Sequence, residues 1–167
     1  MVSVDDVKRL REATGAGVMD AKRALEEAGG NFDQARTLLR ERGMAAAAKR
    51  ADRETGQGTV ESYLHGGGRI GALVELNCET DFVARTDAFK ELARNIAMQV
   101  AAMNPLAIRP EDVPADSNGT PEQNALMTQS FIKDSSKTIQ QLIQDVIATT
   151  GENVRVARIA RFELGQQ

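Results

Sequence analysis

Residues 69–103 read RIGALVELNCETDFVARTDAFKELARNIAMQVAAM, and a strand pattern changes to a helix pattern inside this stretch. Apolar residues alternate with others up to Cys78, which is the period of two that indicates a strand. From Phe89 to Met103 apolar residues recur at helical spacing, and Thr86 or Asp87 stands where a helix cap is expected. The stretch therefore predicts a sheet covered by a helix, with residues 79–85 at the corner between them.

Strand patterns on either side of this stretch extend the sheet. Thr59–His65 alternates as well, and Gly66–Gly68 would turn it into the strand Arg69–Cys78 as a hairpin. A lone hairpin is only marginally stable, so the alternating segment 154–164 is predicted as a third, antiparallel strand. One face of that strand would carry five apolar residues and be interrupted by Arg158. The five are Val154, Val156, Ala160, Phe162 and Leu164.

Helical patterns dominate the N-terminal third. Three short helices are predicted: residues 3–13 with Ser3 as the cap, Val18 to Gly29-Gly30, and Asn31 to about Gly43. Their expected inner faces carry Val4, Val7 and Leu10 in the first helix, Val18, Ala21, Leu25 and Ala28 in the second, and Phe32, Ala35, Leu38 and Leu39 in the third. The alanine-rich residues 44–53 favour a helical connector.

The four prolines of the chain all lie within residues 104–121, which predicts an irregular loop. Thr120-Pro121-Glu122-Gln123 is a helix start, and we expect a short helix from there to about Gln129. A further helix is expected to begin at Ser135 or Ser136 and to stop at Gly151.

These elements predict an α+β fold with three parts. Residues 1–43 would be an N-terminal three-helix bundle, and residues 44–57 a helical or flexible linker. Residues 58–167 would be an α+β core, a three-stranded antiparallel sheet packed with helices, with an irregular loop at 104–120.

Composition argues against several classes of function. The net charge is −3, so nothing indicates nucleic acid or an acidic membrane as a partner, and no segment has the length and apolarity of a membrane span. One cysteine excludes an internal disulfide, and Cys78 is expected to be buried in the strand. We expect a cytoplasmic protein.

Parts for catalysis or cofactor binding are also missing from the sequence. A single His and a single Cys cannot build a structural zinc site, and neither Gly15–Gly17 nor Gly66–Gly68 is followed by the Lys-Ser/Thr pair of a phosphate loop. We therefore expect no metal, no cofactor and no enzymatic activity.

The corner residues Asp81 and Phe82 have two interpretations. Phe82 could be a wedge that enters a partner, with Asp81 competing for a charged site there. The alternative is that Phe82 packs as a satellite of the core and Asp81 caps the following helix, which is the commoner fate of apolar residues at such junctions.

Three long blocks decide how to weigh these interpretations. LREATGAGVMDAKRAL at 10–25, NCETDFVAR at 77–85 and GENVRVARIARFELG at 151–165 stand in the order typical of translation elongation factor Ts, and the chain resembles that family over roughly residues 3–103 and 131–165. The resemblance implies a guanine-nucleotide exchange factor that binds elongation factor Tu and promotes GDP release by perturbing its magnesium and nucleotide site. It also implies that the N-terminal bundle is shaped like a ubiquitin-associated domain and that the core at 58–167 is of the dimerisation type. Fold analogy alone does not license ubiquitin binding.

The resemblance also implies particular contact residues. Thr80, Asp81, Phe82 and Val83 match the family's TDFV wedge. The docking residues implied by motif match are Lys8, Val18, Met19 and Lys22 in the N-terminal module, His65 in the hairpin, and Ile132 and Lys133 near the C-terminal end. Ser135 stands where the family usually has Pro, and Thr150 where it commonly has Ile. Because the chain has one core subdomain where long members have two, it resembles the short bacterial form. We therefore expect a homodimer that binds two partner molecules, with the sheet or its exposed edge at the interface between the two copies.

Two other functions stay open at this point. One is a generic helical binding module that uses the N-terminal bundle to hold a peptide or a ubiquitin-like partner, so that residues 1–43 alone would retain function. The other is an RNA-binding protein that uses Arg155, Arg158 and Arg161 of the last strand, and its binding would fall steeply with salt.

Overall fold

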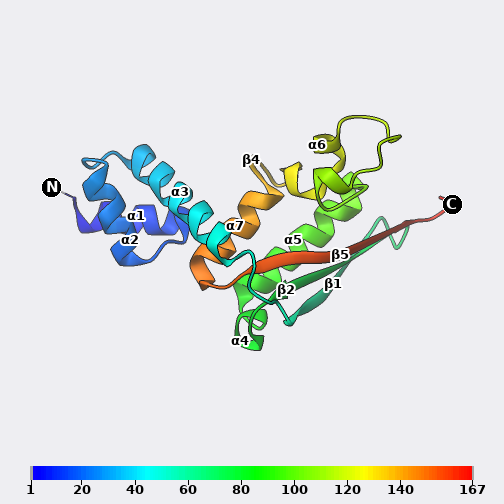
Figure 1. The fold of residues 1–167 in the computed structure, drawn as a ribbon, viewed down its shortest axis with the longest axis horizontal. Helices are drawn as coiled ribbons and strands as arrows, with labels where there is room; N and C mark the ends of the chain where they lie inside the picture. The colour runs from blue at the N-terminus through cyan, green and yellow to red at the C-terminus, as the bar shows by residue number, and fades with distance from the viewer. Residues whose placement is uncertain (1, 167) are drawn as a thin grey trace. The chain divides into compact units, whose positions relative to one another are not determined.

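The computed structural model describes residues 2–166 (Figure 1). They form two compact units. The first runs to Arg53 and includes Gln144–Asn153, and the second consists of Glu54–Ile143 and the stretch from Val154 onward. The α+β class predicted from the sequence is confirmed.

The first unit contains three whole helices, α1 (Val4–Thr14), α2 (Val18–Glu27) and α3 (Phe32–Arg50), together with residues 144–150 of a later helix. Ser3 caps α1 as predicted, because its hydroxyl accepts a hydrogen bond from the Asp6 amide at 3.0 Å. Gly15, at φ 69°, ends that helix in the left-handed conformation that glycine adopts without strain. The buried cluster between the helices is Leu10, Ala21, Ala24, Leu25 and Ala35.

Two predictions for this unit are wrong. α3 does not end near Gly43 but continues to Arg50, because one glycine costs a helix only about 1 kcal/mol and the alanines that follow are the best helix formers. Val4 and Val18, expected on inner faces, are exposed because they lie in the first turns of their helices, beyond the small core.

A three-stranded antiparallel sheet in the order β1-β2-β5 organises the second unit, and the predicted topology is confirmed. Its strands are β1 (Gln57–His65), β2 (Ile70–Cys78) and β5 (Val154–Glu163). After a short helix α4 (Asp81–Ala84), the long helix α5 (Asp87–Met103) packs along the sheet (Figure 1). Thr86 is the N-cap of α5 and accepts a hydrogen bond from the Phe89 amide at 3.3 Å.

The sheet and α5 enclose the core of this unit. Ala72, Val74, Leu76 and Cys78 of β2 are buried, as the alternation predicts. Facing them, α5 buries Phe89, Leu92, Ala93, Ile96, Ala97 and Val100. Cys78 is fully buried, in agreement with its expected structural role.

The predicted inner face of the last strand is wrong beyond its first residues. Val154 and Val156 are buried, but Phe162 is 74% exposed and Leu164 is also exposed. The cause is a bulge: Glu75 pairs with Arg158 but its neighbour Leu76 pairs with Val156, so β5 carries one extra residue. An extra residue reverses which side chains face the core from that point on, because side chains alternate along a strand.

The segment after α5 is largely irregular, with one 3₁₀ turn η1 (Pro110–Asp112). α6 (Pro121–Asn124) begins with the predicted cap. The Thr120 amide donates to the Gln123 side-chain oxygen at 3.1 Å, and the Gln123 amide donates to the Thr120 hydroxyl at 3.3 Å. It ends at Asn124 and not near Gln129, because the Asn124 carbonyl accepts the Leu106 amide at 2.8 Å. A 3₁₀ turn η2 (Leu126–Thr128) follows.

The predicted helix start at Ser135 or Ser136 is also wrong. Asp134–Thr138 is strand β4, which pairs with β3 (Ser130–Phe131), and the helix α7 (Ile139–Thr150) starts after it. Thr138 and Gln141 form the actual cap. The Thr138 amide donates to the Gln141 side-chain oxygen at 2.9 Å, and the Gln141 amide donates to the Thr138 hydroxyl at 3.2 Å. The expected stop at Gly151 is confirmed, since its amide bonds to the Ile147 carbonyl at 2.9 Å.

Candidate functional site

The corner after β2 is a single helical turn that points one apolar side chain outward and one inward. Phe82 is 78% exposed, whereas Val83, the next residue, is 5% exposed and packs into the unit. The satellite-core interpretation of Phe82 is therefore wrong. An exposed aromatic on α4 is what the wedge interpretation requires.

Hydrogen bonds hold α4 in place at both ends. The Thr80 hydroxyl accepts a bond from the Val83 amide at 3.3 Å, and the Cys78 thiol donates to the Thr80 carbonyl at 3.1 Å. At the other end the Thr86 hydroxyl donates to the Val83 carbonyl at 2.8 Å. Since α4 also packs against β1, β2 and α5, Phe82 is presented from a fixed support.

Asp81 does not cap a helix. Thr80 caps α4 and Thr86 caps α5, so the capping interpretation of Asp81 is wrong. Its carboxylate forms an ion pair with Arg85 at 3.0 Å, and both side chains are largely exposed. An exposed pair of this kind contributes little to stability and is free to exchange partners on binding.

The second candidate pair, Ile132 and Lys133, forms the turn between β3 and β4. Ile132 is 42% exposed. The Lys133 ammonium donates to the Asn95 side-chain oxygen at 3.2 Å, which ties the turn to α5. Asn95 lies eight residues after the start of α5, a distance of about 12 Å along the helix axis, so one helix supports both this turn and the corner that carries Phe82.

His65 is not brought near these residues. The corner follows Cys78, which pairs with Gln57 at the start of β1, whereas His65 stands at the far end of that strand, about 26 Å away at the usual rise per residue. His65 is exposed and stacks on Tyr63 with ring centroids 6.1 Å apart, and its Nδ1 lies 3.3 Å from the Tyr63 hydroxyl. Any contact it makes would belong to another part of a partner.

The four candidates of the first unit are all exposed. Val18 and Met19 lie in the first turn of α2, and Lys22 follows one turn later with a loose ion pair to Glu26 at 3.7 Å. Lys8 is exposed on α1. Exposed apolar side chains flanked by cations suit a docking surface with an apolar centre and a charged rim.

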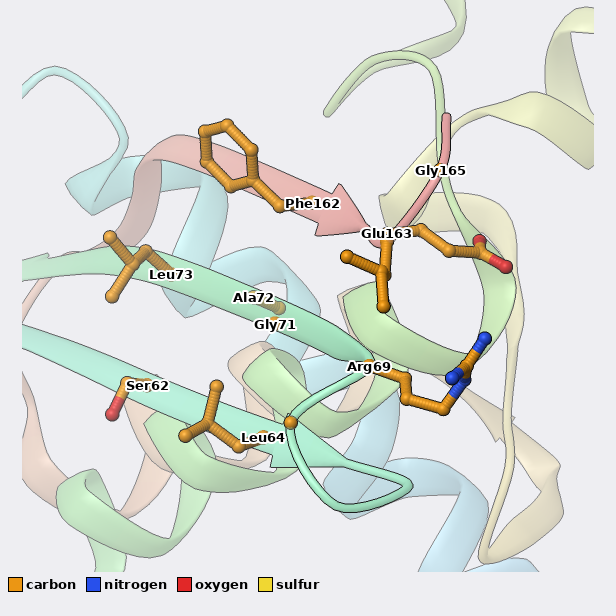
Figure 2. A pocket seen from close by; sticks show the side chains of 11 residues that line it. Ser62, Leu64, Arg69, Gly71, Ala72, Leu73, Phe162, Glu163 and Gly165 are labelled. Atoms are coloured by element: carbon orange, nitrogen blue, oxygen red, sulfur yellow. The ribbon is translucent and has the colours of Figure 1, made fainter. Parts of the chain in front are cut away.

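The sheet was expected at the dimer interface, but the apolar cluster on its outer face was not predicted from the sequence. Leu64, Leu73 and Phe162 project from three adjacent strands to the same side, with Gly71 between them (Figure 2). They line a depression of about 500 Å³. The signal that could have revealed this face is Arg158, whose charge in an otherwise apolar alternation marks the bulge that turns Phe162 outward.

One charged pair lies further along the same face. The Arg158 guanidinium donates to the Glu75 carboxylate at 2.6 Å, and this bond lowers the pKa of Glu75 below its usual range, with a smaller effect from Asn77. Arg161 faces the other way, is nearly buried, and donates to the Ala101 carbonyl at 2.9 Å. Arg158 and Arg161 are therefore engaged on opposite sides of the sheet, which does not favour the RNA-binding alternative.

Neither a metal site nor a membrane span is found within residues 2–166. The described residues contain no group of three or more His, Cys, Asp or Glu side chains that could hold a metal ion. In the same part of the chain, no helix has both the length and the apolarity to cross a membrane.

Fold and site together define an α+β protein whose candidate residues, apart from the buried Val83, are exposed side chains on well-supported elements. This arrangement is suited to contacting another macromolecule. A family model described as elongation factor TS matches residues 24–122. Elongation factor Ts of Thermotoga petrophila is 47% identical over 193 aligned positions, which cover 99% of this chain and 97% of the relative. The chain belongs to the elongation factor Ts family, and its role lies in translation elongation.

Two further relatives agree. Elongation factor Ts of Rubrobacter xylanophilus is 46% identical, covering 96% of this chain and 98% of the relative. That of Desulforamulus reducens is 48% identical, covering 99% and 90%. The resemblance inferred from the three sequence blocks is confirmed. The aligned lengths exceed the 167 residues of this chain, so these relatives contain residues that it lacks.

Proposed function

We propose that this protein is a guanine-nucleotide exchange factor that binds elongation factor Tu and promotes GDP release. The observation that carries the proposal is the exposure of Phe82 on a fixed helical turn, in a chain that belongs to the elongation factor Ts family. An aromatic side chain left 78% in water contributes little to the stability of the unit that displays it.

The mechanism would be a difference in affinity and not a covalent step. Mg²⁺ holds nucleotide phosphates to a GTPase and tolerates little departure from octahedral geometry. Phe82 entering beside that site would displace its supporting groups, while Asp81, released from Arg85, would compete for a charge there. Such a factor must bind the empty GTPase more tightly than the loaded one, and by linkage incoming nucleotide then expels the factor. The protein itself would need no cofactor and act as no enzyme.

Two surfaces would supply the affinity that drives this exchange. Val18, Met19, Lys22 and Lys8 would dock the first unit on the nucleotide domain of elongation factor Tu. Ile132 and Lys133 would contact a second domain of the partner. Thr80 and Val83 would act by holding the wedge, since both are engaged within the unit.

We also propose that two copies associate through the outer face of the sheet. Leu64, Leu73 and Phe162 give this face an apolar centre, and the Glu75–Arg158 pair lies on it as a group that a two-fold partner could reproduce. Two sheets packed in this way would bury the exposed apolar side chains in a sandwich. Light scattering at micromolar concentration tests this: a dimer mass is expected, and a monomer mass would count against it.

The test of the main proposal is the release of a fluorescent GDP analogue from purified elongation factor Tu in the presence of Mg²⁺. Strong acceleration by this protein at substoichiometric concentration is expected, because each molecule is expelled by nucleotide and acts again. A measurement of binding to empty and to GDP-loaded elongation factor Tu should show tighter binding to the empty form. Equal affinity for both forms would refute the mechanism, since such a factor could not shift the nucleotide equilibrium.

A further inference from the structure

A fully buried polar side chain, Gln99, lies in the C-terminal half of α5. Gln99 has no exposed surface, yet its amide has two donors and two acceptor positions that water can no longer satisfy. Burying an unpaired amide is unfavourable, so the partners of this side chain indicate what it holds.

Those partners are the two sides of the β3–β4 turn. The Gln99 nitrogen donates to the Ser130 carbonyl at 3.1 Å and to the Gln129 side-chain oxygen at 3.3 Å. Its oxygen accepts the Ile132 amide at 3.0 Å. One side chain thus bonds to the backbone before and after Phe131, as a neighbouring strand would do.

The turn needs this support because its own ladder is short. β3 and β4 share only two registered pairs, Ser130 with Thr138 and Phe131 with Asp134, and the register shifts between them. Phe131 is buried and provides the apolar anchor, while Ile132 next to it points outward. One helical turn before Gln99, Asn95 accepts the Lys133 ammonium, so the same face of α5 holds both exposed residues of the turn.

We infer that Gln99 is a positioning residue that fixes Ile132 and Lys133 for contact with the partner. This inference rests on the proposed function, in which these two residues dock on elongation factor Tu. Gln99 itself is fully buried and would touch no partner; it acts by ordering the turn before binding, so that less conformational freedom is lost on association.

The first test needs no partner. Gln99→Met keeps the length and volume of the side chain but removes its hydrogen bonds. Amide hydrogen exchange by NMR should then be about tenfold faster at Ile132, the change expected when one hydrogen bond is lost, with α5 amides such as that of Ile96 as the internal reference. Val100→Ala, in the same helix, is the matched control, since it removes buried apolar atoms but no bond to the turn. Unchanged protection of the Ile132 amide in Gln99→Met would overturn the inference.

The second test links Gln99 to docking through a double-mutant cycle on GDP release. Ile132→Ala should reduce the exchange efficiency at least about fivefold if the side chain is a binding hot spot. Gln99→Met should reduce it in a similar way, and the double variant should lose little more than either single one, because both changes remove the same contact. Additive losses, or a loss with Ile132→Ala and none with Gln99→Met, would overturn the inference. A wild-type protein that does not accelerate GDP release would instead refute the proposed function, and the amide measurement would still stand on its own.

Discussion

Phe82→Ala separates the function of the exposed corner from its contribution to stability. Phe82 is 78% exposed, so only about a fifth of its side-chain surface is buried in the folded protein, and only this buried contact is lost on substitution by Ala. A fully covered Phe side chain buries roughly 200 Å², so the buried part of Phe82 amounts to about 45 Å² of apolar surface. At ~25 cal/mol per Å², the expected loss of unfolding free energy is only about 1 kcal/mol.

The expected loss of exchange activity is larger. If the partner covers the exposed part of the ring, about 155 Å² leaves water on binding, which sets an upper limit of ~4 kcal/mol. Part of this is offset by the costs of association, so a value typical of an aromatic hot spot, about 2 kcal/mol, is expected. This corresponds to a roughly 30-fold lower exchange efficiency.

The assay is the rate of release of a fluorescent GDP analogue from elongation factor Tu as a function of factor concentration, with thermal unfolding of each variant in parallel. Leu106→Ala is the matched control for an exposed apolar side chain outside the proposed contacts, and no change is expected. Phe89→Ala is the opposite control, since Phe89 is fully buried and its truncation should lower stability by about 3–5 kcal/mol. Exchange within threefold of wild type in a folded Phe82→Ala protein would refute the wedge.

Three further predictions concern the sheet. Phe162→Asp should yield monomers in light scattering with an unchanged circular dichroism spectrum, because the ring is exposed in one copy; a persistent dimer would move the proposed interface elsewhere. The pKa of Glu75 is lowered by its bond to Arg158, so the pair stabilises the folded state at pH values above the Glu75 pKa of the unfolded chain. This contribution is lost as the pH falls through the lower Glu75 pKa of the folded state. Arg158→Ala should therefore raise the Glu75 pKa in an NMR titration, and an unchanged pKa would contradict the role given to Arg158. Gly58→Ala should destabilise the second unit by about 2 kcal/mol or more in denaturant unfolding, because a Cβ would lie 2.1 Å from the Leu76 carbonyl oxygen; an unchanged midpoint would argue against that close approach.

Local signals in the sequence were sufficient for most elements. The hairpin, the caps at Ser3, Thr86 and Thr120, and the stop at Gly151 all depend on residues within a few positions of one another. Capping and alternation act over such short ranges, so they can be predicted without knowing what packs against them. The three sequence blocks likewise sufficed to predict the family.

The lengths of the helices and the start of α7 were predicted less well, although part of the information about them lies in neighbouring residues. Gly43 was overweighted as a helix breaker, although the alanines after it favour continuing the helix. The Thr138–Gln141 cap was present in the sequence, but the serines before it offered a competing start. Only the pairing of β4 with β3 excludes those serines from the helix.

What the sequence by itself determined is the order of the elements, the class of the fold and the position of Asp81 and Phe82 at a corner. Tertiary structure alone decided which way side chains point: that Phe82 is exposed, that Phe162 turns outward after the bulge opposite Glu75, and that Gln99 reaches the turn at Ile132. Exposure and register depend on which surfaces meet across distant parts of the chain. A local pattern carries no information about them, because the same alternation or helical stripe is compatible with either face being covered.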